Sequence, residues 1–308
     1  MSELAELSGC GPATVTKLEE AGILTLKNLA VTSPIEIATV SGVSEKTARK
    51  LIQQARESLN LGFQKASEYA HKRDNVKQIS VGCEAFDTML DGGFESGSIT
   101  EVYGETASGK TQISHLMVVR ALLENKENKA MFIDSENTFR ASRIKDFCEG
   151  QGLDYDDAME RLYVTQSHNT DEQLLLVDEV EKILQTDNSY RILVIDSLTS
   201  HFRAEYSGRG ELAPRQQKLN KHLHQLLKIA SVYNLVVLVT NQVSANPAQM
   251  FGDPTKPIGG NIVSHSVTSI IYLRKGKAGA IHAQLVDSPH LPKNECDYFV
   301  KTEGFVDV

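Results

Sequence analysis

The run GETASGKT at Gly104–Thr111 has the residue types and spacing of a phosphate-binding loop. It fits the pattern GxxxxGK[ST], in which glycines let the backbone curl so that several N–H groups face the phosphates. The amine of Lys110 would reach the β- and γ-phosphates, and the Thr111 hydroxyl would bind Mg²⁺. The sequence therefore predicts an ATP–Mg²⁺ site contacted by Gly104, Glu105, Thr106, Ala107, Ser108, Gly109, Lys110, Thr111 and Gln112.

Acidic residues at the ends of two apolar runs have the chemistry needed beside such a loop. The run RILVIDS, residues 191–197, contains Asp196, whose carboxylate could hold Mg²⁺ or, taken alone, could simply cap the next turn. The run KAMFIDSE, residues 129–136, ends in two acids. We expect Glu136, which lies further beyond the strand, to position the attacking water, and Asp134 to be structural.

The segment NQVSANPAQMFGDPTKPIGGN, residues 241–261, shows no helical or strand period. Long irregular segments inside compact domains are uncommon and are usually functional. We expect the preceding strand to end at Gln242, whose amide would bond the γ-phosphate and couple the nucleotide state to this segment. The candidate catalytic residues are therefore Lys110, Glu136 and Gln242.

Another irregular segment, the first of the two in chain order, follows Asp196 and contains Arg203, Arg209 and Arg215, and the run at 241–261 is the second segment. Arg215 comes just after Pro214, in the first turn of an expected helix, where a cation opposes the helix dipole. We favour the interpretation that an anion such as a DNA phosphate binds beside Arg215 and offsets the unfavourable placement. The alternative is that Arg215 is solvated or pairs with a nearby acidic side chain. The two segments together could line a groove for single-stranded DNA. The expected DNA contacts are Arg203, Arg209, Arg215, Gly259, Gly260 and Asn261.

The elements that must position these groups follow an alternating order from about residue 80. Several apolar runs are continuous, as in strands that are buried on both faces of a sheet. The sequence therefore predicts an α/β domain with a mostly parallel sheet, whose carboxyl edge carries the ligand-binding segments. The expected strands are residues 98–105, 129–136, 162–167, 191–197, 235–242 and 269–276, with helices at 112–125, 170–185 and 214–234.

The chain before residue 60 is expected to be helical. Residues 12–22 and 44–60 each have helical spacing of apolar residues, and each follows a glycine-bearing turn. Pro12 suits a first helical turn, and Ser44 suits an N-cap. Two such units match the helix-hairpin-helix pattern, in which a glycine turn exposes backbone N–H groups to a DNA phosphate. A small helical bundle whose glycine turns only change the chain direction is an equally good interpretation. We divide the chain into a helical domain at 1–60, a linker at 61–80 and an α/β core at 81–308.

Composition limits the classes of protein to consider. Among 308 residues the net charge is −8, so any contact with nucleic acid must be local. No apolar stretch is long enough to cross a membrane, and the first residues do not read as a signal peptide. Four cysteines without a CxxC pair suggest free thiols. These features favour a cytoplasmic protein, associated with the nucleoid if it binds DNA.

Taken together, the motifs resemble those of the archaeal RadA recombinases, which are related to the eukaryotic strand-exchange recombinases and more distantly to bacterial RecA. The resemblance covers nearly the whole chain and is carried by GGFESGSITEVYGE, SGRGELAPRQQKLNKHL, FGDPTKPIGGNIVSHS, YLRKGK and DSPHLP. It implies a RecA-like P-loop ATPase core with an N-terminal helix-hairpin-helix domain. It also implies ATP-dependent assembly into helical filaments on single-stranded DNA, with rings as an alternative assembly, and strand exchange with double-stranded DNA.

The resemblance further implies roles for single residues. Arg143 would pack on the adenine, and Asp287 and Pro292 would form a cap over the nucleotide of a neighbouring subunit. His265 would link ATP to the segment at 243–261. A Phe-x-x-Ala motif in the linker would dock into the next subunit and add a strand to its sheet edge, giving a filament that does not close. That motif consists of Phe63 and Ala66.

The chain departs from the family pattern in three places. Thr106-Ala107 stands where Phe-Gly or a similar pair is usual, and FRASR at 139–143 stands where FRPER is usual. Asn246 replaces a common arginine. These changes leave the phosphate-binding groups in place, but they bear on the placement of Arg143 and on the grip on DNA.

Three other functions are compatible with parts of the sequence. A regulatory paralogue would bind ATP and DNA but exchange strands poorly. The helical domain and the complete second segment argue against this function. A P-loop phosphotransferase would need a closed pocket for a small substrate, which the arginine- and glycine-bearing segments fit poorly. A purely structural filament would need neither Glu136 nor Gln242.

Overall fold

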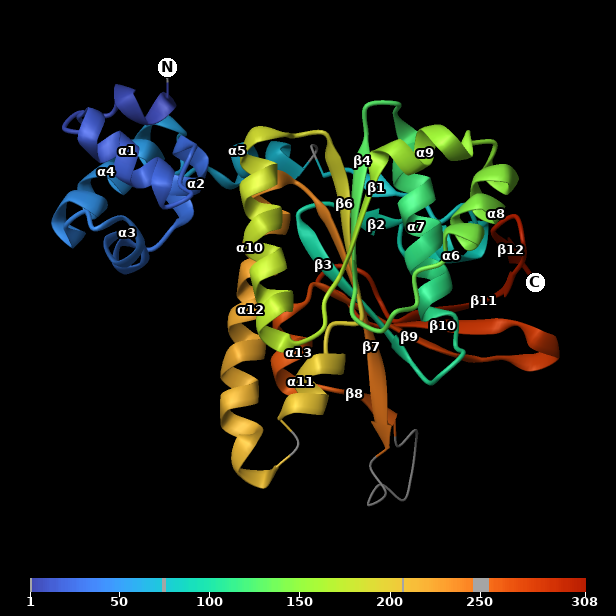
Figure 1. Ribbon diagram of the computed structural model, residues 1–308. Helices are drawn as coiled ribbons and strands as arrows, with labels where there is room; N and C mark the ends of the chain where they lie inside the picture. Colours follow the sequence, from blue (N-terminus) through green and yellow to red (C-terminus); the bar gives the residue numbers. More distant parts are fainter. Residues whose placement is uncertain (1, 74–75, 207, 246–254) are drawn as a thin grey trace. The chain divides into compact units, whose positions relative to one another are not determined.

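The computed structural model describes residues 2–73, 76–206, 208–245 and 255–308. The chain forms two compact units. One comprises Met1–Asn75 with Val180–Asn188, and the other comprises Val76–Glu179 with Ser189–Val308 (Figure 1). In the described ranges, no helix combines the length and the apolar character that crossing a membrane requires. The four cysteines are free thiols.

The N-terminal unit is a small helical bundle around its own apolar core, which includes Leu18, Leu29 and Leu51. Ser44 caps a helix as expected, because its side chain accepts from the Thr47 N–H. The helices of this unit before residue 60 are η1 (Glu3–Glu6), α1 (Pro12–Glu20), α2 (Leu26–Val31), α3 (Pro34–Ser41) and α4 (Glu45–Ser58).

Residues 61–80, which we interpreted as a linker, contain secondary structure. Helix α5 spans Ala66–Arg73, and β1 (Gln78–Ile79) pairs antiparallel with β2 (Phe94–Glu95). Phe63 lies just before α5, and its side chain is fully exposed.

The larger unit is built on a ten-stranded sheet with the order β12-β11-β10-β9-β3-β7-β6-β4-β5, and β8 pairs with β7. Strands β9, β3, β7, β6, β4 and β5 are parallel, as the sequence predicts, and β10–β12 extend the sheet antiparallel. The strands are β3 (Ser98–Gly104), β4 (Lys129–Asp134), β5 (Leu162–Gln166), β6 (Tyr190–Asp196), β7 (Val236–Ala245), β8 (Thr255–Pro257), β9 (Ser269–Lys275), β10 (Ile281–Asp287), β11 (Asn294–Val300) and β12 (Phe305–Asp307).

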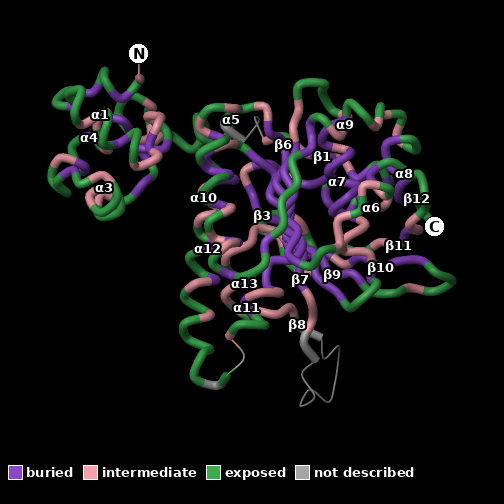
Figure 2. Tube along the Cα trace, viewed as in Figure 1, coloured by how far each residue is buried: buried purple, intermediate pink, exposed green. Residues whose placement is uncertain are grey.

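Helices cover both faces of this sheet, with α7 on one face and α12 on the other (Figure 1). The central strands are consequently buried on both sides, and every residue of β3 and β6 is buried (Figure 2). Strand β5 at the edge has four exposed residues out of five. The helices are α6 (Glu84–Met89), α7 (Lys110–Glu124), α8 (Ala141–Gln151), α9 (Tyr155–Arg161), α10 (Thr170–Thr186), α11 (Ser200–Glu205), η2 (Arg209–Glu211), α12 (Leu212–Tyr233), α13 (Asn261–Ser266) and η3 (Lys277–Gly279).

The expectation that the strand ends at Gln242 was wrong. Strand β7 continues to Ala245 and pairs antiparallel with β8, with Val243 opposite Pro257. The prolines and glycines of this segment gave no indication of a short hairpin. The hairpin is held by hydrogen bonds between its two strands and not by the strand propensity of its residues. Residues 246–254, which include Asn246, lie outside the described residues.

Candidate functional site at the carboxyl edge of the sheet

The phosphate-binding loop joins β3 to α7, which confirms the predicted strand-loop-helix order. Gly104 has no room for a side chain, because a Cβ there would lie 2.2 Å from the Leu273 carbonyl oxygen of β9. Gly109 precedes α7 with a φ of +94°, a conformation that L side chains rarely adopt. Both glycines are therefore required by the path of the loop.

The Lys110 ammonium lies within this loop. Its Nζ donates to the carbonyls of Gly104 at 2.9 Å and Glu105 at 2.8 Å. Burial lowers the pKa of Lys110, and the carboxylates of Asp196 and Glu136 act in the opposite direction. The negative charges nearby favour a protonated amine, which is the form that binds phosphate.

Asp196 lies at the buried end of β6, beside the first turn of α7. The hydroxyls of Thr240 and Thr111 donate to its carboxylate. Burial raises the pKa of Asp196, and these hydroxyls oppose the rise. Asp196 Oδ2 is buried without a hydrogen-bond partner in the described part of the chain, as is Ser108 Oγ. Such orphaned oxygens fit a site that is completed by a metal-bound water and a phosphate.

The donor set fits Mg²⁺ better than a metal that needs many protein ligands. Thr111 supplies a hydroxyl and Asp196 a carboxylate, and Mg²⁺ is commonly held by one or two protein groups together with phosphates and waters. Within the described residues, no group of three or more His, Cys, Asp or Glu side chains could hold an ion.

The two acids at the end of β4 and just beyond it have different surroundings. The Asp134 carboxylate accepts the backbone N–H groups of Glu136, Thr138 and Phe139, which holds the turn that leads to α8. The exposed Glu136 carboxylate instead faces neighbouring side chains: Ser197 Oγ donates to Oε1 at 2.5 Å. Glu136 thus lies where strand ends meet, and Asp134 supports the turn beneath it.

Gln242 connects the Glu136 carboxylate to the first segment, which carries Arg203. Gln242 Nε2 donates to Glu136 Oε1 at 2.9 Å, and Arg203 Nη1 approaches Gln242 Oε1 at 3.5 Å. In the register of the sheet, Gln242 lies beside Gly104 at the start of the phosphate-binding loop. The structure therefore brings the three predicted catalytic residues to the same edge of the sheet.

Arg215 lies in the first turn of its helix, as the sequence predicts, although the helix starts earlier than expected. Helix α12 begins at Leu212, before Pro214, so Arg215 is its fourth residue and lies at the end of the first turn. The sequence pattern missed this start because a proline inside the first turn looks like the first helical residue. Among the side chains that the structure describes, none forms an ion pair with Arg215, which leaves this cation available to an anion.

The second segment returns to the core through two glycines. Gly259 and Gly260 have φ angles of +98° and +56°, and a Cβ on Gly259 would lie 2.4 Å from Val263 Cγ2. Helix α13 then begins at Asn261 and carries the exposed His265. Arg209 lies in η2.

Arg143 is fixed close to the first turn of α7. Its Nε donates to Gln112 Oε1 at 2.6 Å, and its guanidinium lies 3.7 Å from the centre of the Phe147 ring. The carbonyls of Lys301 and Thr302 also accept from the guanidinium and help to hold Arg143 in this place.

The expected cap residues do not join the phosphate-binding loop of their own chain. Asp287 pairs with Ile270 near the start of β9, whereas Gly104 pairs with Leu273 further along that strand. Asp287 and Pro292 are exposed, as are Phe63 and Ala66.

The sequence analysis missed several residues of the site. Ser197 and Thr240 hydrogen-bond to the two key acids, and Asn241 binds the buried Glu101 of β3. The polar pair Thr240-Asn241 interrupts an apolar run, and this pattern could have indicated a buried polar site at the end of the strand.

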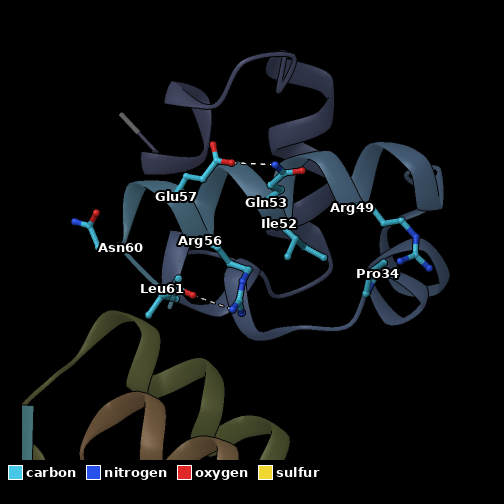
Figure 3. Close-up of a pocket in the computed structure, with 9 residues that line it drawn as sticks. Pro34, Arg49, Ile52, Gln53, Arg56, Glu57, Asn60 and Leu61 are labelled. Atoms are coloured by element: carbon cyan, nitrogen blue, oxygen red, sulfur yellow. Dashed lines mark hydrogen bonds between the residues drawn. The ribbon is translucent and has the colours of Figure 1, made fainter. Parts of the chain in front are cut away.

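The N-terminal unit has the geometry of a helix-hairpin-helix. Gly42 ends α3 with a φ of +67°, and Ser44 starts α4. A groove of about 680 Å³ lies beside α4 and is lined partly by Arg49, Ile52 and Arg56 (Figure 3). Arg56 Nη2 donates to the Leu61 carbonyl at 2.9 Å.

Comparison with known proteins supports both units. A family model described as a SAM-like helix-hairpin-helix tandem matches residues 1–57, and the Rad51 model matches residues 72–308. The chain is 42% identical over 306 residues to a DNA repair and recombination protein RadA from Metallosphaera sedula. That match covers 98% of this chain and 94% of the relative. The chain therefore belongs to the Rad51 family of RecA-like recombinases.

Proposed function

We propose that the nucleotide bound at the P-loop controls how this recombinase holds DNA. As a member of the Rad51 family, the chain is a DNA-dependent ATPase that exchanges strands between DNA molecules in recombination and repair. In the proposed cycle it binds ATP, assembles on single-stranded DNA and tests double-stranded DNA by base pairing. The protein holds mainly the backbone, and hydrolysis resets the assembly.

ATP and Mg²⁺ would be held by groups at the carboxyl edge of the sheet. Lys110 would bind the β- and γ-phosphates, and Thr111 and Asp196 would hold the metal. When bound, Mg²⁺ would neutralise charge that develops on the phosphates. Glu136 would orient the attacking water, and Arg143 would lie against the base.

One observation carries the proposed coupling: the bonds that run from Arg203 through Gln242 to Glu136. Gln242 belongs to the strand that leads into one candidate DNA segment, and Arg203 belongs to the other. A γ-phosphate that competes for the Gln242 amide would change the contacts of both segments at once. His265 on α13 would add a second link to the same segment.

Contacts with DNA would come mainly from backbone amides and arginines. Arg203, Arg209 and Arg215 would contact phosphates from the first segment, and Gly259, Gly260 and Asn261 from the second. Such contacts carry little sequence information, which suits a protein that must accept any single strand.

The proposed filament depends on contacts between identical subunits. Phe63 is fully exposed on a single chain, and a large apolar side chain in this state suggests a docking group. Strand β5 is an open edge, and its Tyr163 and Val164 are exposed. Phe63 and Ala66 of one subunit would dock at this edge of the next, beside an added strand. This head-to-tail contact gives a helix, or a ring where the rotation closes.

The cap would also come from a neighbour. Asp287 and Pro292 are exposed and lie away from their own P-loop, so they are available to cover the nucleotide of an adjacent subunit. ATP affinity and subunit assembly would then be linked by mass action.

The test is ATP hydrolysis with and without single-stranded DNA at fixed salt, together with filter binding of labelled DNA. Clear stimulation by DNA, abolished by Lys110→Ala, would support the proposal. DNA binding without stimulation would indicate a regulatory member of the family. If the protein neither binds DNA nor is stimulated by it, the assignment of the two DNA segments is refuted.

A further inference from the structure

The carboxamide of Asn241 makes four hydrogen bonds inside the core. Its Nδ2 donates to Glu101 Oε1 at 2.7 Å and to the Ile258 carbonyl at 2.6 Å. Its Oδ1 accepts from the Thr199 hydroxyl at 2.6 Å and from the Gln242 N–H at 2.9 Å. An amide side chain has two donor hydrogens and an oxygen with two lone pairs, so these bonds use its full capacity.

The partners determine which way this amide points. The Ile258 carbonyl can only accept a hydrogen bond, and the Gln242 N–H can only donate one. A flipped amide of Asn241 would place oxygen against oxygen and hydrogen against hydrogen. Because Asn241, Glu101 and Thr199 are all buried, a lost bond would leave a polar group without water to replace its partner.

The partners of Asn241 come from three functional parts of the chain. Glu101 lies in β3, the strand that leads into the P-loop. Thr199 is the N-cap residue of α11, which carries Arg203. Ile258 follows β8 and precedes the glycines and α13, and its N–H also donates to the Gln242 carbonyl at 3.0 Å. One side chain therefore ties the P-loop strand to both candidate DNA segments.

We propose that Asn241 is a positioning residue that couples ATP to DNA by holding both DNA segments against the P-loop strand. The idea rests on the proposed function described above. Asn241 fixes the backbone at Gln242, while the half-buried side chain of Gln242 remains able to exchange partners. Loss of the anchor should therefore impair the response to DNA more than the binding of ATP.

The sharpest variants are at Thr199, since they change one bond of the network. Thr199→Val removes the hydroxyl at nearly constant volume, and Thr199→Ser keeps it. We expect Thr199→Val to lower single-strand affinity and DNA-stimulated hydrolysis by roughly 3- to 10-fold, the effect of one hydrogen bond. ATP affinity, measured with a fluorescent ATP analogue, should stay within about twofold, and Thr199→Ser should behave like the unmodified protein.

A second measurement does not depend on DNA. Amide hydrogen exchange over residues 255–266 should increase in Asn241→Leu and Thr199→Val, and exchange in β3 should stay constant. Thermal melting establishes that each variant is folded. If Asn241→Leu does not fold, the pair of Thr199 variants still decides the question.

Three results would overturn the proposal. Thr199→Val could reduce ATP and DNA affinity equally, Thr199→Ser could fail to restore the response, or exchange over residues 255–266 could stay unchanged in the folded variants. If the unmodified protein shows no stimulation by DNA, the proposed function fails separately. Exchange over residues 255–266 then decides the positioning role alone, with faster exchange supporting it.

Discussion

The Gln242 amide donates to the Glu136 carboxylate with an Nε2–Oε1 distance of 2.9 Å. The two residues lie 106 positions apart in the chain, and each follows the apolar part of its own strand. The same carboxylate oxygen accepts from Ser197 at the end of β6. The candidate water-positioning residue and the candidate γ-phosphate sensor thus share a hydrogen bond, so a change at one must alter the surroundings of the other.

Glu136→Gln should separate ATP binding from hydrolysis. The amide keeps the size of the side chain but cannot act as a base, and loss of a positioned base typically costs 10²- to 10⁴-fold. We expect ATP hydrolysis to fall by about 100-fold or more, with ATP-dependent DNA binding retained. Single-turnover hydrolysis and DNA binding on the same preparation measure the two effects.

Glu160→Gln is the matched control, since Glu160 is an exposed residue of α9. Its hydrolysis rate should match that of the unmodified protein. A Glu136→Gln protein that hydrolyses ATP at the normal rate would show that another group positions the water.

Phe63→Glu should break the assembly and leave the single chain intact. The Phe63 side chain is fully exposed, so its removal costs the isolated fold little. A charge at this position cannot enter an apolar pocket of a neighbour without a large desolvation cost. We expect sedimentation and light scattering to show monomers or short species, with an unchanged melting temperature.

Tyr69→Glu provides the comparison, because Tyr69 is also an exposed aromatic residue and lies on α5. It should assemble normally. An unchanged size distribution for Phe63→Glu, or equal losses in both variants, would contradict the docking role.

Local patterns were enough to place the phosphate-binding loop. The loop, its glycines and the helix that begins at Lys110 follow one another in the chain, so spacing alone fixes their relationship. The continuous apolar run of β6 likewise indicated burial on both faces, and the structure confirms it. Features of this kind depend on neighbouring residues only.

Contacts between distant strands were not accessible in this way. Glu101 meets Asn241 because β3 lies beside β7, and neither the partner of a strand nor its register follows from one sequence. The hairpin of β7 and β8 and the antiparallel strands β10–β12 were missed for the same reason. Pairing, and not intrinsic propensity, holds these elements.

Burial of Glu101 should make stability depend on pH. Burial raises the pKa of this carboxyl to about 7, against an ordinary value of 4.5. Between these two values the folded chain keeps a proton that the unfolded chain has lost, so stability falls as pH rises towards 7. The contribution lost is up to about 3 kcal/mol.

Glu101→Gln cannot ionise and should lose this dependence. Its stability relative to the unmodified protein should rise steadily between pH 5 and 7 and then level off, in urea unfolding at several pH values. The variant can still accept a bond from Asn241 at the same position. A difference in stability that is constant over this range would show that Glu101 is ionised throughout in the fold.

Ala107 occupies a backbone conformation better suited to glycine. Its φ is +61°, within the P-loop. A Cβ in the left-handed region destabilises the folded chain by roughly 1–2 kcal/mol, and glycine removes this cost. Glycine also increases the conformational entropy of the unfolded chain, which offsets about 0.4–1 kcal/mol of the stabilisation. Ala107→Gly should therefore stabilise the protein by about 0.5–1 kcal/mol.

Ala107→Val tests the same cause in the opposite direction. Ala107 is exposed, so a larger side chain meets no packed core, and only the backbone conformation opposes it. We expect valine, which is branched at Cβ, to lower stability and weaken ATP binding, because the loop must keep this φ to direct its N–H groups. Thermal melting and ATP titration of both variants give the two effects. Equal stabilities for glycine, alanine and valine would mean that the loop relaxes to a negative φ in solution.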